Sequence, residues 1–371
     1  MGKYPRLTVN HEALRGNMTQ VISWCRDAGI EVAGVIKAAT GMASVALDYE
    51  YCGAKWIASS RLEQLQRAKA EGVKLPLMMI RVPMISELDE MIEVCDYSLQ
   101  SEFATLRALE ESAAKAVKDH NVILMADLGD LREGFFELEE LVDVALYVEN
   151  DLDHIHLAGI GTNLGCYGSV MPTKEKMEQL VEYAEAVEEA IGRKLEIISG
   201  GATSSLMPVF DKEMPDRINM LRIGAVSICG PQEDLRTSYG RKEVDALTEA
   251  FTLEAEVIEV KTKASHPIGK LGVDAFGQKP KYKDRGMRQR ALLAIGRADF
   301  GDLADMVVQL EGAELIGASG DHTILDIEDC KEVVKVGDIV TFKLKYSAIM
   351  RLTASENVKI NEVDRLFGIK L

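Results

Sequence analysis

The chain has 371 residues, 60 of them acidic and 43 basic, so its formal net charge is −17. An acidic surface of this kind repels phosphate backbones, which argues against a nucleic-acid partner. No apolar run approaches the roughly 18 residues of a membrane span, and the start of the chain, MGKYPRLTVN, lacks the apolar stretch of a signal peptide. We therefore expect a globular protein without a membrane partner.

From residue 10 onward, short apolar runs alternate with longer amphipathic stretches. In the first such stretch Asn10 is placed to cap a helix, which Gly29 ends. Most of the apolar runs are continuous, as in parallel strands that are covered by helices. Eight of these runs predict strands, at 31–38, 55–60, 75–80, 96–101, 122–128, 154–163, 195–201 and 218–225.

Eight strand–helix units predict an α/β fold with a (β/α)8 TIM barrel over residues 10–232. The alternative is an open doubly wound sheet, and the number of strands favours closure. Beyond residue 232 the runs become alternating and rich in β-branched residues, with few helices. Residues 1–9 and 233–371 are therefore predicted to form a second, β-rich domain.

Polar residues lie where the predicted strands end, which is where a TIM barrel carries its active site. Lys37 ends the first strand, in GVIKAATG. A glycine-rich turn with hydroxyl groups, SGGATSS (199–205), follows the seventh strand, and LRIGA (221–225) brings a glycine to the end of the eighth. Backbone N–H groups and hydroxyls at these two turns are typical of the phosphate site of this fold. A phosphorylated ligand whose other end meets a lysine amine suggests pyridoxal phosphate held as a Schiff base.

The whole set of motifs resembles one enzyme family. The chain is similar to the alanine racemase-like, fold-type III pyridoxal phosphate enzymes, and most closely to their ornithine/alanine racemase subfamily. The resemblance covers nearly the entire chain and lies in motifs that occur in the expected order: LTVNHEALRGN, GVIKAATG, LMADLGDLREGFF, GIGTNLGCYG, EIISGGATSSL, NMLRIGA, GVDAFGQKP and ASGDHTILDI.

The resemblance implies a role for individual residues. Lys37 would attach the cofactor and act as one catalytic base. Arg222 would face the pyridine nitrogen and keep it unprotonated, and Arg132 and Asp321 would bind the substrate, with Asp321 supplied by the partner subunit. The implied cofactor-binding residues are Lys37, Asn163, Thr203, Ser204, Arg222, Gly224, Ala225 and Tyr346.

The chain departs from the family pattern at three places. Met125 replaces a modified lysine, and Asn163 replaces a histidine that stacks on the cofactor ring. The segment 267–278 lacks the tyrosine that serves as the second base on the partner subunit. Several residues remain candidates for that second base: Lys270, Asp274, His322 and Cys166.

A racemase needs acid–base groups on both faces of the substrate Cα. The resemblance implies a pyridoxal phosphate-dependent amino acid racemase that acts as a homodimer, with ornithine as the expected substrate. The alternatives are alanine or broad-specificity racemisation, a D-amino acid lyase or aldolase, and a non-catalytic cofactor-binding protein. The acidic residues Asp130, Asp274 and Asp284 could bind a side-chain ammonium, although a solvated surface is the commoner role for each.

The cysteines and histidines predict no metal site. Six scattered cysteines without a C-x-x-C pair indicate reduced thiols in a cytoplasmic protein rather than a disulfide framework. His154 and His156 share one face of a predicted strand but have no obvious carboxylate partner.

Overall fold

The computed structural model describes residues 3–231, 233–273, 276–277, 279 and 281–366. The chain forms two compact units. The barrel unit comprises residues 14–230 and 240–248, and the sheet unit comprises the chain up to Ala13, residues 231–239 and the chain from Glu249 onward. No helix among the described residues is long and apolar enough to cross a membrane.

The barrel unit contains a closed ring of eight parallel strands, which confirms the TIM barrel and excludes the open sheet. Each of the eight predicted runs contains one of these strands. They are β2 (Glu31–Val35), β3 (Trp56–Ser59), β4 (Leu77–Met79), β5 (Tyr97–Gln100), β6 (His120–Met125), β7 (Ile155–Gly161), β8 (Ile197–Ser199) and β9 (Met220–Ile223). The ring closes where β2 pairs with β9, with Ala33 opposite Arg222 and Gly34 opposite Ile223.

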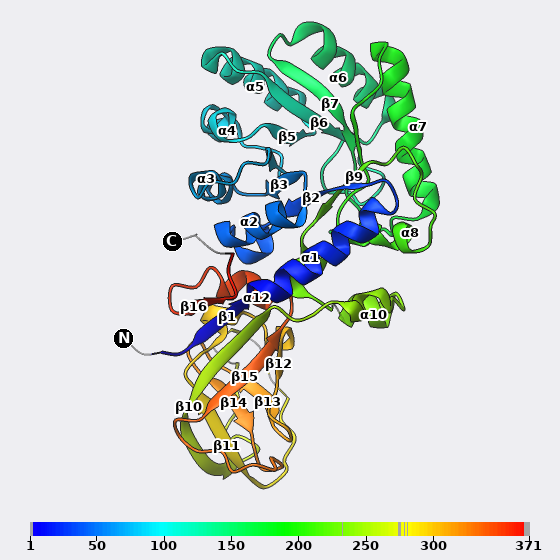
Figure 1. Ribbon diagram of the computed structural model, residues 1–371. Coiled ribbons are helices and arrows are strands. Elements are labelled where there is room, and N and C mark those ends of the chain that lie inside the picture. Colours follow the sequence, from blue (N-terminus) through cyan, green and yellow to red (C-terminus); the bar gives the residue numbers. More distant parts are fainter. Residues whose placement is uncertain (1–2, 232, 274–275, 278, 280, 367–371) are drawn as a thin grey trace. The chain divides into compact units, whose positions relative to one another are not determined.

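A helix follows each of these strands, and helices cover the outside of the barrel, as α3, α4 and α5 show in Figure 1. The helices are α1 (His11–Arg26), α2 (Ala43–Cys52), α3 (Leu62–Ala70), α4 (Leu88–Val94), α5 (Phe103–Ala116), α6 (Leu138–Asp151), α7 (Lys174–Ile191), α8 (Leu206–Phe210) and α9 (Ala225–Cys229). Asn10 caps α1 as predicted, because its Oδ1 accepts the Ala13 N–H at 2.9 Å. Short 3-10 turns occur at η1 (Lys37–Ala39), η2 (Ile85–Glu87), η3 (Thr203–Ser205) and η4 (Glu243–Ala246).

The interior of the barrel is filled by apolar side chains from all eight strands. Met125 belongs to this cluster and is completely buried, so the position where the family carries a modified lysine has a packing role here. Gly159 lets β7 approach β8 closely, since a Cβ at this position would lie 1.9 Å from the carbonyl oxygen of Ile197. The polar side chains of the site therefore lie toward the carboxyl ends of the strands.

The sheet unit is built on an eight-stranded sheet and confirms the predicted β-rich region. Its central order is β12-β15-β10-β11-β14-β13, and β1 pairs with both β10 and β16. The strands are β1 (Arg6–Asn10), β10 (Phe251–Ala264), β11 (Met287–Leu293), β12 (Met306–Val308), β13 (Glu314–Ala318), β14 (Thr323–Asp326), β15 (Ile339–Leu344) and β16 (Lys359–Val363). Short helices accompany them: α10 (Glu233–Ser238), α11 (Arg297–Phe300), η5 (Leu303–Asp305) and α12 (Tyr346–Leu352).

Candidate active site

Lys37 lies at the carboxyl end of β2, where it begins the turn η1. The turn is anchored to the barrel because the Ile36 N–H donates to the Ala58 carbonyl on β3 at 3.0 Å. Ala38 and Ala39 are buried beside it, whereas Lys37 is only partly exposed. The predicted position of this lysine at the mouth of the barrel is therefore the observed one.

The surroundings of Lys37 favour its neutral amine. Burial lowers the pKa of Lys37 below its ordinary value, and the cations Arg132 and Arg222 lower it as well. Cys166 and Glu133 act in the opposite direction, but the net shift is downward. A larger fraction of this lysine is thus unprotonated at neutral pH than of an exposed lysine, as a nucleophile or base requires.

Arg222 on β9 is buried and held in one orientation. Its guanidinium donates to the Ser199 side chain and, through Nη2, to the Thr162 carbonyl at 2.8 Å. Burial lowers the pKa of Arg222 to about 10, so the side chain remains a cation at neutral pH. The end of β8 and the loop after β7 thus fix a positive charge at the same end of the barrel as Lys37.

The glycine-rich turn after β8 is joined to the loop after β7. Ser204 Oγ donates to the Leu164 carbonyl at 2.7 Å, and Ser205 Oγ donates to the Gly200 carbonyl at 2.6 Å. Ser204 would have to exchange its bond to Leu164 in order to donate to a phosphate group. Thr203 begins η3 and Ala225 begins α9, and the first N–H groups of such turns have no carbonyl partner within the turn.

Asp130 is a structural residue that the sequence did not identify as such. It is 1% exposed, and its carboxylate accepts the backbone N–H groups of Gly165 at 2.9 Å and Tyr167 at 3.0 Å. Burial would raise the pKa of Asp130, but these N–H donors outweigh burial and lower it. The hypothesis that Asp130 binds a substrate ammonium does not fit this site, because its oxygens already hold the loop that carries Cys166.

Arg132 is paired with Glu133, a residue that no motif in the sequence marks. Nε and Nη2 of Arg132 donate to the two carboxylate oxygens of Glu133, and this pairing raises the pKa of Arg132. Cys166 is exposed, and it also raises the pKa of Arg132. Lys37, Arg132, Glu133, Cys166 and Arg222 therefore form one electrostatically coupled group, which we call the mouth cluster.

The residues at this mouth fit pyridoxal phosphate. Asn163 has a buried Nδ2 donor that lacks a hydrogen-bond partner among the described residues, so a donor remains for a ligand. The cluster also supplies an amine of lowered pKa and a fixed cation, Lys37 and Arg222. The aldehyde of pyridoxal phosphate matches the amine, and its ring nitrogen, kept unprotonated, matches the cation.

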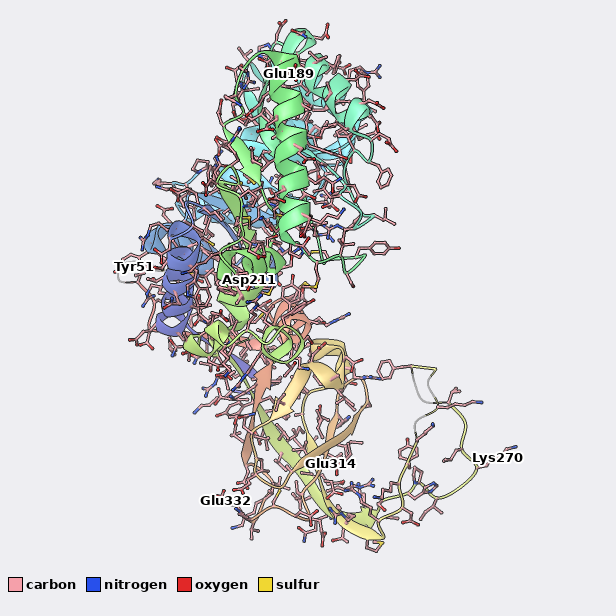
Figure 2. The ribbon with its side chains drawn as sticks, turned by 90° about the vertical axis from the view of Figure 1, so that its right-hand side faces the viewer. Tyr51, Glu189, Asp211, Lys270, Glu314 and Glu332 are labelled. Atoms are coloured by element: carbon pink, nitrogen blue, oxygen red, sulfur yellow. The ribbon has the colours of Figure 1, made fainter. Side chains whose placement is uncertain are left out.

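The remaining candidate residues belong to the sheet unit. Tyr346 begins α12 directly after β15, and Asp321 and His322 lie exposed in the turn between β13 and β14. Lys270 is exposed on the long loop between β10 and β11 (Figure 2). Asp274 lies outside the described residues. The roles predicted for these residues stay predictions.

Asp284 has a local structural role in the same loop between β10 and β11. Its Oδ1 accepts the Gly286 N–H at 2.9 Å and the Ser265 hydroxyl at 3.3 Å. Both of these hydrogen bonds are accepted by Oδ1 of Asp284. A role in binding a substrate ammonium is therefore less well supported for Asp284 than the sequence alone suggested.

The barrel fold and the lysine at its mouth define a class of enzymes that use pyridoxal phosphate. The family model described as "Alanine racemase, N-terminal domain" matches residues 9–230 of this chain. The chain therefore belongs to the alanine racemase family, and it is a pyridoxal phosphate-dependent amino acid racemase, an isomerase.

Similarity to known proteins extends over the whole chain. It is 36% identical over 356 residues to the ornithine racemase of Acetoanaerobium sticklandii, an alignment that covers 96% of this chain and 99% of the relative. It is also 36% identical to the lysine racemase of Thermotoga maritima, covering 96% and 98%. The alanine racemase of D-cycloserine producing Streptomyces lavendulae has the same fold, with a TM-score of 0.76, 18% identity and coverage of 98% and 99%.

The lowered pKa of Lys37 predicts how the cofactor-free enzyme takes up pyridoxal phosphate as pH changes. Only the neutral amine attacks an aldehyde, so the rate of uptake should rise with pH and level off once Lys37 is deprotonated. Stopped-flow absorbance should therefore give a midpoint below that of Nα-acetyl-lysine under the same conditions. A midpoint equal to or above that of the model amine would contradict the electrostatic description of the site.

Proposed function

We propose that this racemase acts on amino acids that carry a second, terminal ammonium group, with ornithine as the principal substrate. The observation that carries the proposal is the mouth cluster, in which a lysine of lowered pKa lies near a guanidinium fork and a carboxylate. The two curated relatives, whose names specify ornithine and lysine, support the same substrate class. Alanine is the alternative substrate, and it lacks a terminal charge.

Each residue of the cluster has a task that follows from its chemistry. Bound pyridoxal phosphate supplies an electron sink that makes the Cα proton of an amino acid acidic. Lys37, whose lowered pKa favours the neutral amine, removes or returns that proton on one face of Cα. Arg132 presents the fork geometry that suits the substrate carboxylate. Arg222 keeps its charge and would lie against the ring nitrogen.

The proton on the opposite face of Cα needs a second acid–base group. Cys166 is the candidate within the barrel unit, where it raises the pKa of both Lys37 and Arg132. Asp130 holds the loop on which Cys166 lies, so the thiol has a defined position. The other candidates, Lys270, Asp274 and His322, belong to the second unit and would act from a partner subunit.

We also propose that the active enzyme is a homodimer in which the sheet unit of one subunit completes the site of the other. The support is the family pattern, in which residues equivalent to Asp321 come from the partner. We propose further that the enzyme works in the cytoplasm, where a reducing medium protects thiols. All six cysteines are free, and Cys166 is exposed.

The proposed activity predicts a specific pattern across substrates and variants. Wild-type enzyme with pyridoxal phosphate should interconvert L- and D-ornithine faster than alanine, as measured by chiral chromatography. Lys37→Ala should lose the visible absorbance of the bound cofactor and slow racemisation by about 10²–10⁴-fold, as the loss of a general base does. Lys55→Ala serves as the matched control. It removes an exposed lysine just before the amino end of β3, whereas Lys37 lies at the carboxyl end of β2.

Three results would each count against parts of this proposal. Absence of the cofactor band in the wild type would remove the chemical basis of the activity. Faster turnover of alanine than of ornithine would overturn the substrate, and carbon–carbon cleavage products would replace the racemase with a lyase.

The homodimer is tested by sedimentation of the active enzyme over a dilution series. Activity per subunit should fall as the dimer dissociates, because each site would lose the groups that its partner supplies. A monomeric species with full activity would refute the shared site.

A further inference from the structure

The pair formed by Arg132 and Glu133 lies in the loop between β6 and α6, and its position is set by the backbone. Phe135 N–H donates to the Met125 carbonyl at 2.7 Å, and Asp127 N–H donates to the Phe135 carbonyl at 3.0 Å, so the loop is closed at its base. Gly134 has φ +135°, and a Cβ there would lie 2.4 Å from the Asp127 nitrogen. This position requires glycine, which fixes where the preceding Glu133 leaves the backbone.

Glu133 is the carboxylate that balances the cations of the mouth cluster. Its charge raises the pKa of Lys37 and of Arg222, and its hydrogen bond raises that of Arg132. Its side chain is 19% exposed, compared with 40% for Arg132. The carboxylate is therefore the more enclosed half of the pair, although a small ligand can still reach it.

The two neighbouring carboxylates of this loop are bound to backbone groups. Asp130 holds Gly165 and Tyr167, and Asp127 accepts the N–H groups of Gly129 at 2.9 Å and Leu131 at 3.1 Å. If either carboxylate turned to a substrate group, the backbone of the loop would lose these hydrogen bonds. Glu133 instead bonds to a side chain, Arg132, which can change its rotamer at little cost to the backbone.

We propose that Glu133 binds the terminal ammonium of the substrate and thereby determines the preference for diamino acids. This inference rests on the proposed function and assigns the substrate specificity of the enzyme to one residue. In the free enzyme Arg132 and Glu133 neutralise each other. A diamino acid brings one carboxylate and one distal ammonium, so it can replace both halves of the pair: Arg132 turns to the carboxylate and Glu133 to the ammonium.

A simpler role for Glu133 would be to neutralise Arg132, and the two roles differ in what they predict. If Glu133 only neutralises Arg132, its removal frees the guanidinium and affects all amino acid substrates alike. If Glu133 binds the ammonium, its removal weakens only those ligands that carry this group. Ornithine and norvaline make this comparison, because they have the same carbon chain and differ in the terminal amine.

The experiment measures Glu133→Gln against wild type with both ligands. The dissociation constant comes from the change in cofactor absorbance on titration, and kcat/KM is measured separately. The affinity for ornithine relative to norvaline should fall at least about tenfold, as expected for the loss of a charged hydrogen bond. Glu140→Gln, on the exposed first turn of α6, removes the same charge nearby and should leave the ratio unchanged.

The outcomes separate this inference from the proposed function. If wild-type enzyme neither binds nor racemises ornithine, the proposed substrate fails and the role of Glu133 fails with it. If wild type prefers ornithine and Glu133→Gln retains the full preference, only the role of Glu133 is overturned.

Should Glu133→Gln fail to bind the cofactor, a second variant, Glu133→Asp, keeps the charge but shortens its reach. Selective weakening of ornithine binding in that variant supports the inference, and equal weakening of both ligands overturns it.

Discussion

The pairing of β2 with β9 is the interaction on which the site depends. It closes the barrel by joining the first and last of its strands, with Ala33 opposite Arg222. Lys37 follows the end of β2 and Arg222 lies within β9, so closure brings a lysine and an arginine from distant parts of the sequence to one mouth. The lowered pKa of Lys37 comes first from its burial at this mouth, and the positive charge of Arg222 adds a smaller contribution in the same direction. An open sheet would leave these two strands at opposite edges and would lose this coupling.

Around this fixed pair, the carboxylates of the loop after β6 have different tasks. Asp127 and Asp130 use their charge to hold backbone N–H groups and thus to shape the loops. Glu133 holds only a side chain, and its charge reaches the cations of the mouth cluster. The barrel interior, including Met125, is apolar and contributes rigidity. Stability and chemistry are therefore assigned to different residues of the same short segment.

Much of the fold could be predicted because its signal is local. Continuous apolar runs marked all eight barrel strands, and Asn10 marked the start of α1. The family and its cofactor followed from motifs around Lys37 and Arg222. The contacts that refine the site are not local: Asp130 meets a loop that begins 35 residues further along the chain. A surface aspartate and a buried, loop-holding one look alike in sequence, so the sequence allows Asp130 as an ammonium ligand and gives no signal for Glu133.

The central claim is that Lys37 and a second acid–base group move the Cα proton of a diamino acid from opposite faces. Deuterium incorporation in D2O tests it most directly, with L-ornithine and D-ornithine supplied separately to the wild-type holoenzyme. Mass spectrometry and NMR at early times should show deuterium at Cα in the product formed from either enantiomer. Bound cofactor without Cα exchange from either enantiomer would contradict the account.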